Sequence, residues 1–262
     1  MHAPAAPGAS RAASTSLAAA PEPVLVSADR EGALLPHDLL WFASPRAYES
    51  PDPLPAWASR EWLGSAPAVV RRASRELPAR IPVGLRGRMR HQRHAAWVDA
   101  RDVIRRVAPE ALARSRAWQT HPQRDALPCL RMLERIAPML DACGLTWGIT
   151  GSVGFTLASG LFVLRQDSDL DLLLRLPRAM SAGAAANLLR ALAALNEQAG
   201  EASRIDVQAD TGHGAFSLAE WAAARGAVLL KTDCGPVLRD DPWATPARPR
   251  MPVTARSCPS AI

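Results

Sequence analysis

Two acidic residues interrupt a run of leucines in the stretch LRQDSDLDLLLRLP, residues 164–177. The run predicts a buried strand, in which side chains two residues apart project from the same face. Asp169 and Asp171 therefore point together, and two carboxylate charges about 4 Å apart repel by roughly 4 kcal/mol at an effective dielectric constant near 20. The opposite, apolar face consists of Leu170, Leu172 and Leu174. A fold that contains this strand must compensate for two neighbouring negative charges.

A divalent cation would turn that repulsion into attraction. Mg²⁺ takes one or two carboxylates, keeps several waters and completes its coordination shell with substrate phosphates. The D-x-D strand therefore predicts a Mg²⁺ site for phosphoryl chemistry, held by Asp169 and Asp171. Asp167 is expected on the same face, nearer the entrance of the strand, and could replace one of the pair. A solvated edge strand with an acidic stripe is the alternative interpretation of this pattern alone.

Two further segments favour phosphate chemistry. In GITGSVGF, Gly151 and Ser152 stand at a predicted strand-to-helix turn, where free backbone N–H groups attract anions and a glycine lets phosphates approach closely. In SRIDVQ, Asp206 lies on a second predicted strand and offers a third carboxylate, either as a metal ligand or as a general base. The order of strand, Gly-Ser turn, helix, D-x-D strand, helix and single-Asp strand is more specific than any of its parts.

Lys231 is the only lysine among the 31 basic residues. It lies in the apolar segment VLLKT, where a compact ammonium group is a plausible contact for a polyphosphate. An edge-strand lysine without such a role is the alternative.

Composition narrows the possible partners. The net charge of +6 rests almost entirely on arginine, and aromatic residues make up only 5% of the chain. Without interleaved basic and aromatic residues there is no base-stacking pattern, which argues against nucleic acid as the partner. The four cysteines form no C-x-x-C pair and are expected to be reduced. No long apolar run or secretory signal is visible, so we expect a cytoplasmic protein that does not bind membranes.

The chain divides into two predicted blocks, residues 24–118 and 119–244, with disordered tails at 1–23 and 245–262. The first block has strand candidates at 67–74 and 80–87 and a predicted helix at 90–107. Seven arginines fall within 21 residues here, between Arg86 and Arg106, on either a solvated helix face or a contact surface for phosphate or an acidic partner.

The second block alternates strands and helices, and the whole chain is predicted to have an α+β fold. Its expected helices cover residues 126–143, 151–160, 179–198 and 218–225. Its expected strands are 145–150, two segments within 161–177, 203–210, 227–232 and a last short strand. Ser217 and Glu220 form a capping-box pattern before the final helix.

The ordered motifs of the second block resemble the nucleotidyltransferase superfamily fold of DNA polymerase beta, with its Gly-Ser turn, paired acidic residues and third acidic residue. A closer resemblance extends from about residue 34 to Trp243. PHDLLW, VVRRA, IPVGLRGRMRHQRHAAW, WGITGSVGF, SDLDLLL and VLLKTDCGPVLRDDPW resemble the malonate decarboxylase holo-acyl-carrier-protein synthase family, the phosphoribosyl-dephospho-CoA transferases.

This resemblance implies transfer of a phosphoribosyl-dephospho-CoA unit from triphosphoribosyl-dephospho-CoA to a serine of the malonate decarboxylase acyl carrier protein, with release of diphosphate. It also implies that Asp169 and Asp171 are catalytic. The alternatives are a nucleotidyltransferase that acts on another acceptor, such as a protein, an antibiotic or RNA, and a nonenzymatic arginine-rich binding module.

Overall fold

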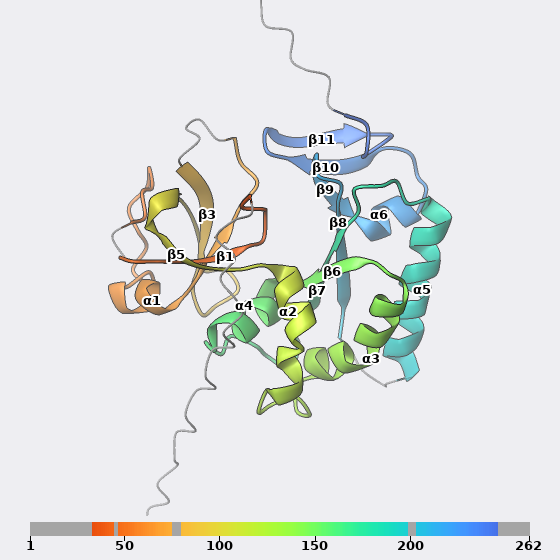
Figure 1. Ribbon diagram of the computed structural model, residues 1–262, viewed down its shortest axis with the longest axis horizontal. Helices are drawn as coiled ribbons and strands as arrows, with labels where there is room; N and C mark the ends of the chain where they lie inside the picture. Colours follow the sequence, from red (N-terminus) through yellow and green to blue (C-terminus); the bar gives the residue numbers. More distant parts are fainter. Residues whose placement is uncertain (1–32, 45–46, 75–79, 199–202, 246–262) are drawn as a thin grey trace, which may run out of the picture.

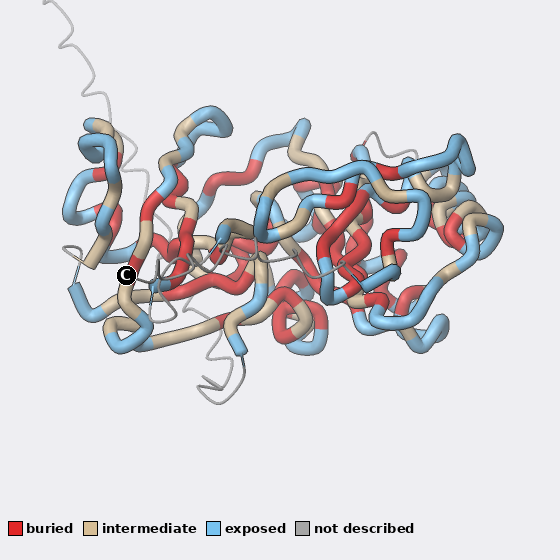
Figure 2. The backbone as a smooth tube through the Cα atoms, turned by 90° about the horizontal axis from the view of Figure 1, so that it is seen from above, coloured by how far each residue is buried: buried red, intermediate tan, exposed pale blue. Residues whose placement is uncertain are grey.

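The computed structural model describes residues 33–44, 47–74, 80–198 and 203–245. The predicted tails, 1–23 and 245–262, lie outside these residues apart from Thr245. Helices and two separate sheets make up the described chain, which confirms the α+β fold class (Figure 1). Buried backbone runs through the centre of the molecule and exposed segments line its outer edges (Figure 2).

The first sheet has five strands in the order β4-β3-β2-β1-β5, and each strand is antiparallel to its neighbours. The predicted strands at 67–74 and 80–87 are confirmed as β2 and β3. The strands are β1 (Leu39–Phe42), β2 (Ala68–Val70), β3 (Arg80–Arg86), β4 (Arg93–Asp99) and β5 (Val103–Val107). A short helix α1 (Arg60–Ser65) and a 3-10 turn η1 (Ala100–Asp102) complete this half.

The second sheet has six strands in the order β11-β10-β9-β8-β7-β6. These are β6 (Thr146–Ile149), β7 (Leu170–Arg175), β8 (Ile205–Asp210), β9 (Ala215–Ser217), β10 (Val228–Thr232) and β11 (Gly235–Arg239). Only the pair β7–β8 is parallel among these described strands, and helix α5 (Ala182–Gln198) makes the crossover that a parallel pair requires. The predicted leucine face of β7 is confirmed, since Leu170, Leu172 and Leu174 are all buried in the core.

The remaining helices pack around the second sheet. They are α2 (Pro109–Ser115), the 3-10 helix η2 (Ala117–Thr120), α3 (Pro128–Ala142), α4 (Gly151–Ser159) and α6 (Leu218–Ala222). The predicted helices at 126–143, 151–160 and 179–198 are confirmed as α3, α4 and α5. The predicted block boundary near residue 118 falls between the two sheets, close to η2, and the boundary itself stays a prediction.

The predicted helix at 90–107 is wrong. This segment forms β4 and β5, joined by η1. Alanine and arginine favour helices in isolation, but the burial pattern alternates along β4, where Ala96 and Val98 are buried and pair with Val83 and Ile81 of β3. Pairing with β3 is a tertiary interaction, and it overrides the local preference.

Two other predictions need smaller corrections. Residues 161–177 contain one strand, β7, rather than two, because residues 161–169 form an irregular connection. The capping pattern does mark the start of a helix, α6, but the Ser217 side chain makes no capping hydrogen bond. The carboxylate of Glu220 instead accepts a hydrogen bond from the Leu229 N–H at 3.1 Å.

A buried ionic network joins the two halves of the molecule. Arg72, which follows β2, donates from Nη2 to Asp210 Oδ2 on β8 at 2.7 Å. Arg175 on β7 pairs with the same Asp210 oxygen and, through Nε, with Glu110 of α2 at 2.6 Å. Asp210 is only 5% exposed, so its charge depends on these two guanidinium groups rather than on water.

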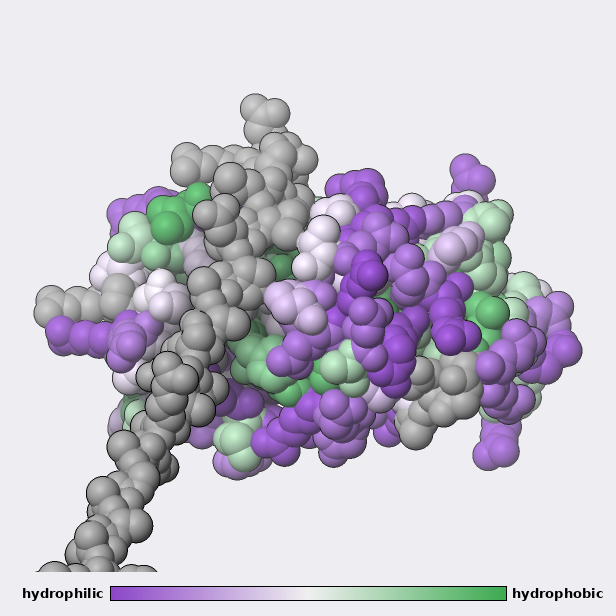
Figure 3. Space-filling view, turned by 90° about the horizontal axis from the view of Figure 1, so that it is seen from below, coloured by the Kyte–Doolittle hydropathy of each residue, from purple (hydrophilic) through white to green (hydrophobic). Residues whose placement is uncertain are grey.

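The surface has few large apolar side chains exposed. On the face drawn in Figure 3, hydrophobic side chains form separate small groups between hydrophilic ones, as on an ordinary solvent-exposed surface. No helix in the described part of the chain is long and apolar enough to cross a membrane.

We expect the substitution Asp210→Asn to lower the free energy of unfolding by about 3–5 kcal/mol, because it leaves the buried Arg72 guanidinium without its close carboxylate and leaves Arg175 with Glu110 alone. Asp233 is the matched control, since it lies 4.0 Å from Arg72 but is 66% exposed. Asp233→Asn should cost less than about 1 kcal/mol. Urea denaturation of both variants makes the comparison, and an equal loss in the two would contradict the role given to the network.

Candidate active site

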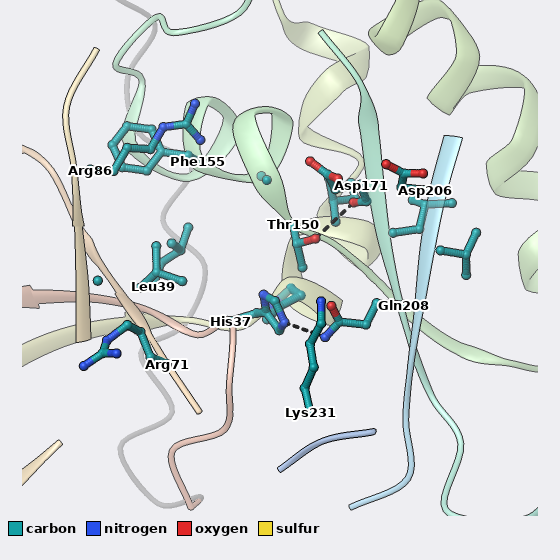
Figure 4. Close-up of a pocket in the computed structure, with 18 of the residues that line it drawn as sticks. His37, Leu39, Arg71, Arg86, Thr150, Phe155, Asp171, Asp206, Gln208 and Lys231 are labelled. Atoms are coloured by element: carbon teal, nitrogen blue, oxygen red, sulfur yellow. Dashed lines mark hydrogen bonds between the residues drawn. The ribbon is translucent and has the colours of Figure 1, made fainter. Parts of the chain in front are cut away.

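A cleft of about 760 Å³ lies between the two sheets. The first half contributes His37 and Arg86, α4 contributes Gly151, and the second sheet contributes Asp171 and Asp206 (Figure 4). The cleft is therefore lined with groups of both charge signs that are far apart in the sequence.

Two carboxylates, Asp171 and Asp206, line one end of this cleft, and Asp169 is close enough to Asp171 to affect its charge without lining the cleft. Asp171 on β7 and Asp206 on β8 are direct partners in the parallel register, and their side chains lie next to each other (Figure 4). Asp169 lies one residue before β7, and its Oδ2 is 3.1 Å from Arg90 Nη2. Asp206 Oδ1 pairs with Arg204 Nη2 at 3.0 Å. Asp167 is exposed in the turn that precedes this group and does not line the cleft.

The carboxyl group of Asp171 lies in surroundings that disfavour its negative charge. Burial raises its pKa, and the nearby charges of Asp206 and Asp169 raise it further, while Arg90 and Arg86 counteract this in part. A carboxylate whose pKa is raised by neighbouring carboxylates indicates negative charge that the protein itself does not fully compensate. The cluster can therefore accept a cation.

The donor atoms here suit Mg²⁺, which prefers carboxylate oxygens and tolerates few of them. Within the described residues, no three His, Cys, Asp or Glu side chains already converge into a ready-made metal site. A cation at Asp169 and Asp171 would thus take its other ligands from water and substrate. The Mg²⁺ site stays a prediction.

The Gly-Ser turn is built against the D-x-D strand. The N–H of Thr150 donates to the Asp171 carbonyl oxygen at 2.9 Å, and helix α4 begins at the next residue. Gly151 has φ 61°, and a Cβ atom there would lie 1.8 Å from Asp171 Oδ2. Only glycine fits both the backbone angle and the space, so the anion-attracting end of α4 approaches the carboxylates closely. Ser152 lies one residue further and accepts a hydrogen bond on Oγ from Arg86 Nη2 at 2.7 Å.

A second polar group occupies the other part of the cleft. His37 Nε2 is 2.9 Å from Gln208 Nε2, and Lys231 on β10 lies beside them (Figure 4). Burial lowers the pKa of His37 to about 4, with Arg72 and Arg175 adding to the effect. The ring is therefore neutral at pH 7, so Nε2 can accept the amide hydrogen of Gln208. Lys231 lies apart from the carboxylates, at the end of the cleft that His37 and Gln208 occupy.

Sequence reasoning gives no role to His37 or Gln208, and it treats Arg86 only as one of seven arginines on either a solvated face or a contact surface for phosphate or an acidic partner. His37 and Arg86 belong to the motifs PHDLLW and IPVGLRG, but nothing in their local pattern says that they face the second sheet. Asp38 is fully buried, accepts a hydrogen bond from the Leu35 N–H and pairs with Arg106 at 2.8 Å, so it fixes the chain before β1.

Two family models cover almost all of the described chain. Residues 35–109 match the phosphoribosyl-dephospho-CoA transferase MdcG N-terminal domain, and residues 111–242 match the MdcG C-terminal domain. Curated proteins named phosphoribosyl-dephospho-CoA transferase are also similar. The protein of Pseudomonas syringae pv. tomato is 46% identical over 211 residues, 80% of this chain and 93% of its own length. That of Pseudomonas aeruginosa is 44% identical over 210 residues, 79% of this chain and 93% of its own. No solved structure matches.

Replacement of Gly151 by alanine should destabilise the chain more than the same change at Gly144. Both glycines have positive φ, 61° and 64°, so each alanine pays about 1–2 kcal/mol for the left-handed backbone. Only at Gly151 does the new methyl group meet the Asp171 carboxylate, whereas nothing lies within 4 Å at Gly144. The difference in the free energy of unfolding should be at least about 1 kcal/mol, and identical values from urea denaturation would disprove the close approach.

The neutral His37 should make the fold sensitive to mild acid. Its pKa is about 4 when folded and near 6.5 when unfolded. Between these values the unfolded chain binds more protons, so stability falls as the pH drops from 6.5 to 4. His37→Asn keeps a residue that tolerates the positive φ of 76° at this site. The loss of unfolding free energy between pH 7 and pH 5 should be about 2 kcal/mol larger for the unmodified chain than for this variant. Equal losses would mean that His37 titrates normally.

Proposed function

Because this chain belongs to the phosphoribosyl-dephospho-CoA transferase family, we propose that it modifies a carrier protein with that prosthetic group. The family makes the chain a transferase. In the proposed reaction the donor is triphosphoribosyl-dephospho-CoA, the acceptor is a serine of the malonate decarboxylase acyl carrier protein, and the second product is diphosphate.

The observation that carries this proposal is the position of Asp171 and Asp206 in the cleft beside the anion-attracting turn. Asp171 lies in contact range of Gly151, and Asp206 lies on the neighbouring strand in direct register. A triphosphate seated at the turn would thus bring its reacting phosphorus next to groups that hold a cation or accept a proton. The cleft of about 760 Å³ is also of the size that takes a large ligand.

The roles of the residues follow from this placement. The serine oxygen forms a bond to the α-phosphorus, and the bond from that phosphorus to the oxygen bridging to the β-phosphate breaks, so diphosphate leaves. The N–H groups at the start of α4, with Ser152, hold phosphate oxygens. Mg²⁺, when held by Asp169 and Asp171, supplies positive charge that offsets the charge of the triphosphate.

Asp206 has two possible roles in this scheme, third metal ligand or base for the serine proton. Its side chain is 43% exposed, so an acceptor that arrives from solvent can reach it, and this favours the base. Lys231 lies further along the cleft, where its ammonium group can contact a more distant part of the donor.

The direct test weighs the carrier protein before and after reaction. Apo carrier, triphosphoribosyl-dephospho-CoA and Mg²⁺ are incubated with the enzyme, and intact mass spectrometry should show the carrier gaining one phosphoribosyl-dephospho-CoA unit. Parallel reactions contain ATP or CTP as the donor. Labelling from those nucleotides alone would replace the proposal with a nucleotidyltransferase of another kind.

The same assay tests the carboxylates. Asp171→Asn should reduce transfer at least about 100-fold, since it removes a ligand of the cation whose positive charge would stabilise the reacting phosphate by several kcal/mol. Asp167→Asn is the control, because this exposed carboxylate lies only four residues away but outside the cleft, and its variant should transfer normally. Full activity of a folded Asp171→Asn enzyme would rule out the assignment.

A further inference from the structure

Arg86 is a buried cation without a carboxylate. The residue ends β3 and is only 5% exposed, and it lines the cleft. Its guanidinium lies over the Phe155 ring, 5.1 Å from the ring centre, and donates from Nη2 to Ser152 Oγ. Across the described ranges, no Asp or Glu lies within 4.0 Å of it, and its Nε has no hydrogen-bond partner.

A buried guanidinium without a carboxylate partner lowers the stability of the fold. An unpaired buried charge loses several kcal/mol of hydration, and here the positive charges of Arg93 and Arg90 make the cost larger. Burial, followed by Arg93, lowers the pKa of Arg86 to about 10; Asp171 counteracts this in part, and Arg90 adds a smaller decrease. The guanidinium nevertheless remains charged at neutral pH, so an anion that enters the cleft would find an unsatisfied cation already in place.

The neighbouring arginines come from the same hairpin. We call Arg86, Arg88, Arg90 and Arg93, from β3, β4 and the turn between them, the arginine hairpin. Arg90 reaches Asp169 at 3.1 Å, and Arg93 lines the cleft and interacts electrostatically with Asp171. The first sheet thus places positive charge directly over the Gly-Ser turn of the second half.

We propose that Arg86, together with Arg93, binds the β- and γ-phosphates of the donor, the part that leaves as diphosphate. The inference rests on the proposed function for the identity of the donor. Ser152 links the two halves of this subsite, because it stands in the first turn of α4 and already contacts the Arg86 guanidinium. A planar guanidinium with free N–H groups can bridge two phosphate oxygens, which a lysine ammonium cannot match in geometry.

This placement gives the arginines a chemical role in the transfer step. As the serine oxygen bonds to the α-phosphorus and the bridging oxygen departs, negative charge grows on the diphosphate. The carboxylates cannot stabilise that charge. Arg86 and Arg93 can, and they lie on the side of α4 that faces the first sheet (Figure 4 shows Arg86 beside Phe155).

A purely structural role for Arg86 makes a different prediction. If it only packs on Phe155 and bonds to Ser152, its replacement by methionine would change stability without changing anion binding. Arg105 is a matched control, because it also stacks on an aromatic ring, Trp41, and donates to α4 through Ala158, but does not line the cleft.

The experiment is calorimetric titration of the enzyme with inorganic pyrophosphate in the presence of Mg²⁺. Arg86→Met should weaken binding at least about 10-fold, which corresponds to about 1.4 kcal/mol. Arg86→Lys should recover part of the affinity, and Arg105→Met should bind as the unmodified enzyme does. Replacement of the buried Arg86 can prevent folding, so the same titration is also made with Arg93→Met, a change at an exposed residue. This variant should bind pyrophosphate several-fold more weakly.

Two outcomes separate this inference from the proposed function. Unchanged pyrophosphate affinity in the folded Arg86→Met and Arg93→Met variants overturns the subsite, even if the carrier protein is modified normally by the unmodified enzyme. If pyrophosphate binding depends on the arginines but the carrier protein is not modified, the subsite is supported and the proposed donor and acceptor are wrong. If Arg86→Lys retains part of the pyrophosphate affinity and Arg86→Met does not, a role of Arg86 in packing alone is excluded.

Discussion

The cleft exists because Asp210 holds one arginine from each half of the molecule. Arg72 follows a strand of the first sheet and Arg175 lies in the second, and both reach the same buried carboxylate oxygen. None of the three charges could remain buried alone, so the two halves are held at a fixed separation. Side chains alternate along β8, so Asp206 and Gln208 lie on the same face of the strand as Asp210. One strand face runs from a structural ion pair, through a polar contact with His37, to the candidate catalytic carboxylate.

The two charge groups of the cleft neutralise each other only in part. Asp171 is fixed by the Gly151 turn, and Arg86 is fixed by Phe155 and Ser152, so neither can move far toward the other. Arg90 does reach Asp169, but it is 80% exposed and gains little from that contact. A ligand that carries phosphates and a divalent cation would satisfy both groups at once. This separation of charge is the physical reason to expect a polyphosphate here rather than a singly charged substrate.

Local patterns were enough to predict one side of the site. The D-x-D spacing, the Gly-Ser turn and Asp206 could be predicted because strand and turn signals span only a few residues, and the structure brings these residues together. The other side depends on contacts between distant segments. Arg86 belongs to a predicted strand, but its burial comes from contact with Phe155 and Ser152 of α4. The alanines and arginines of β4 favour a helix locally, so the sequence predicts a helix there. His37 is unusual only through its contacts with Gln208 and the arginine network, none of which leaves a sequence pattern.

Helix α4 shows why the two family domains must act as one unit. Its first turn carries Gly151 and Ser152, which face the carboxylates and Arg86. Its next turn carries Phe155, which is 1% exposed and packs with Trp62 in the core of the first sheet. The segment 111–242 alone would expose this phenylalanine and lack both Arg86 and His37, while the segment 35–109 would hold a cationic hairpin with no anion-binding turn opposite. Docking of the sheets and assembly of the site are therefore the same event, because a single short helix contributes to both.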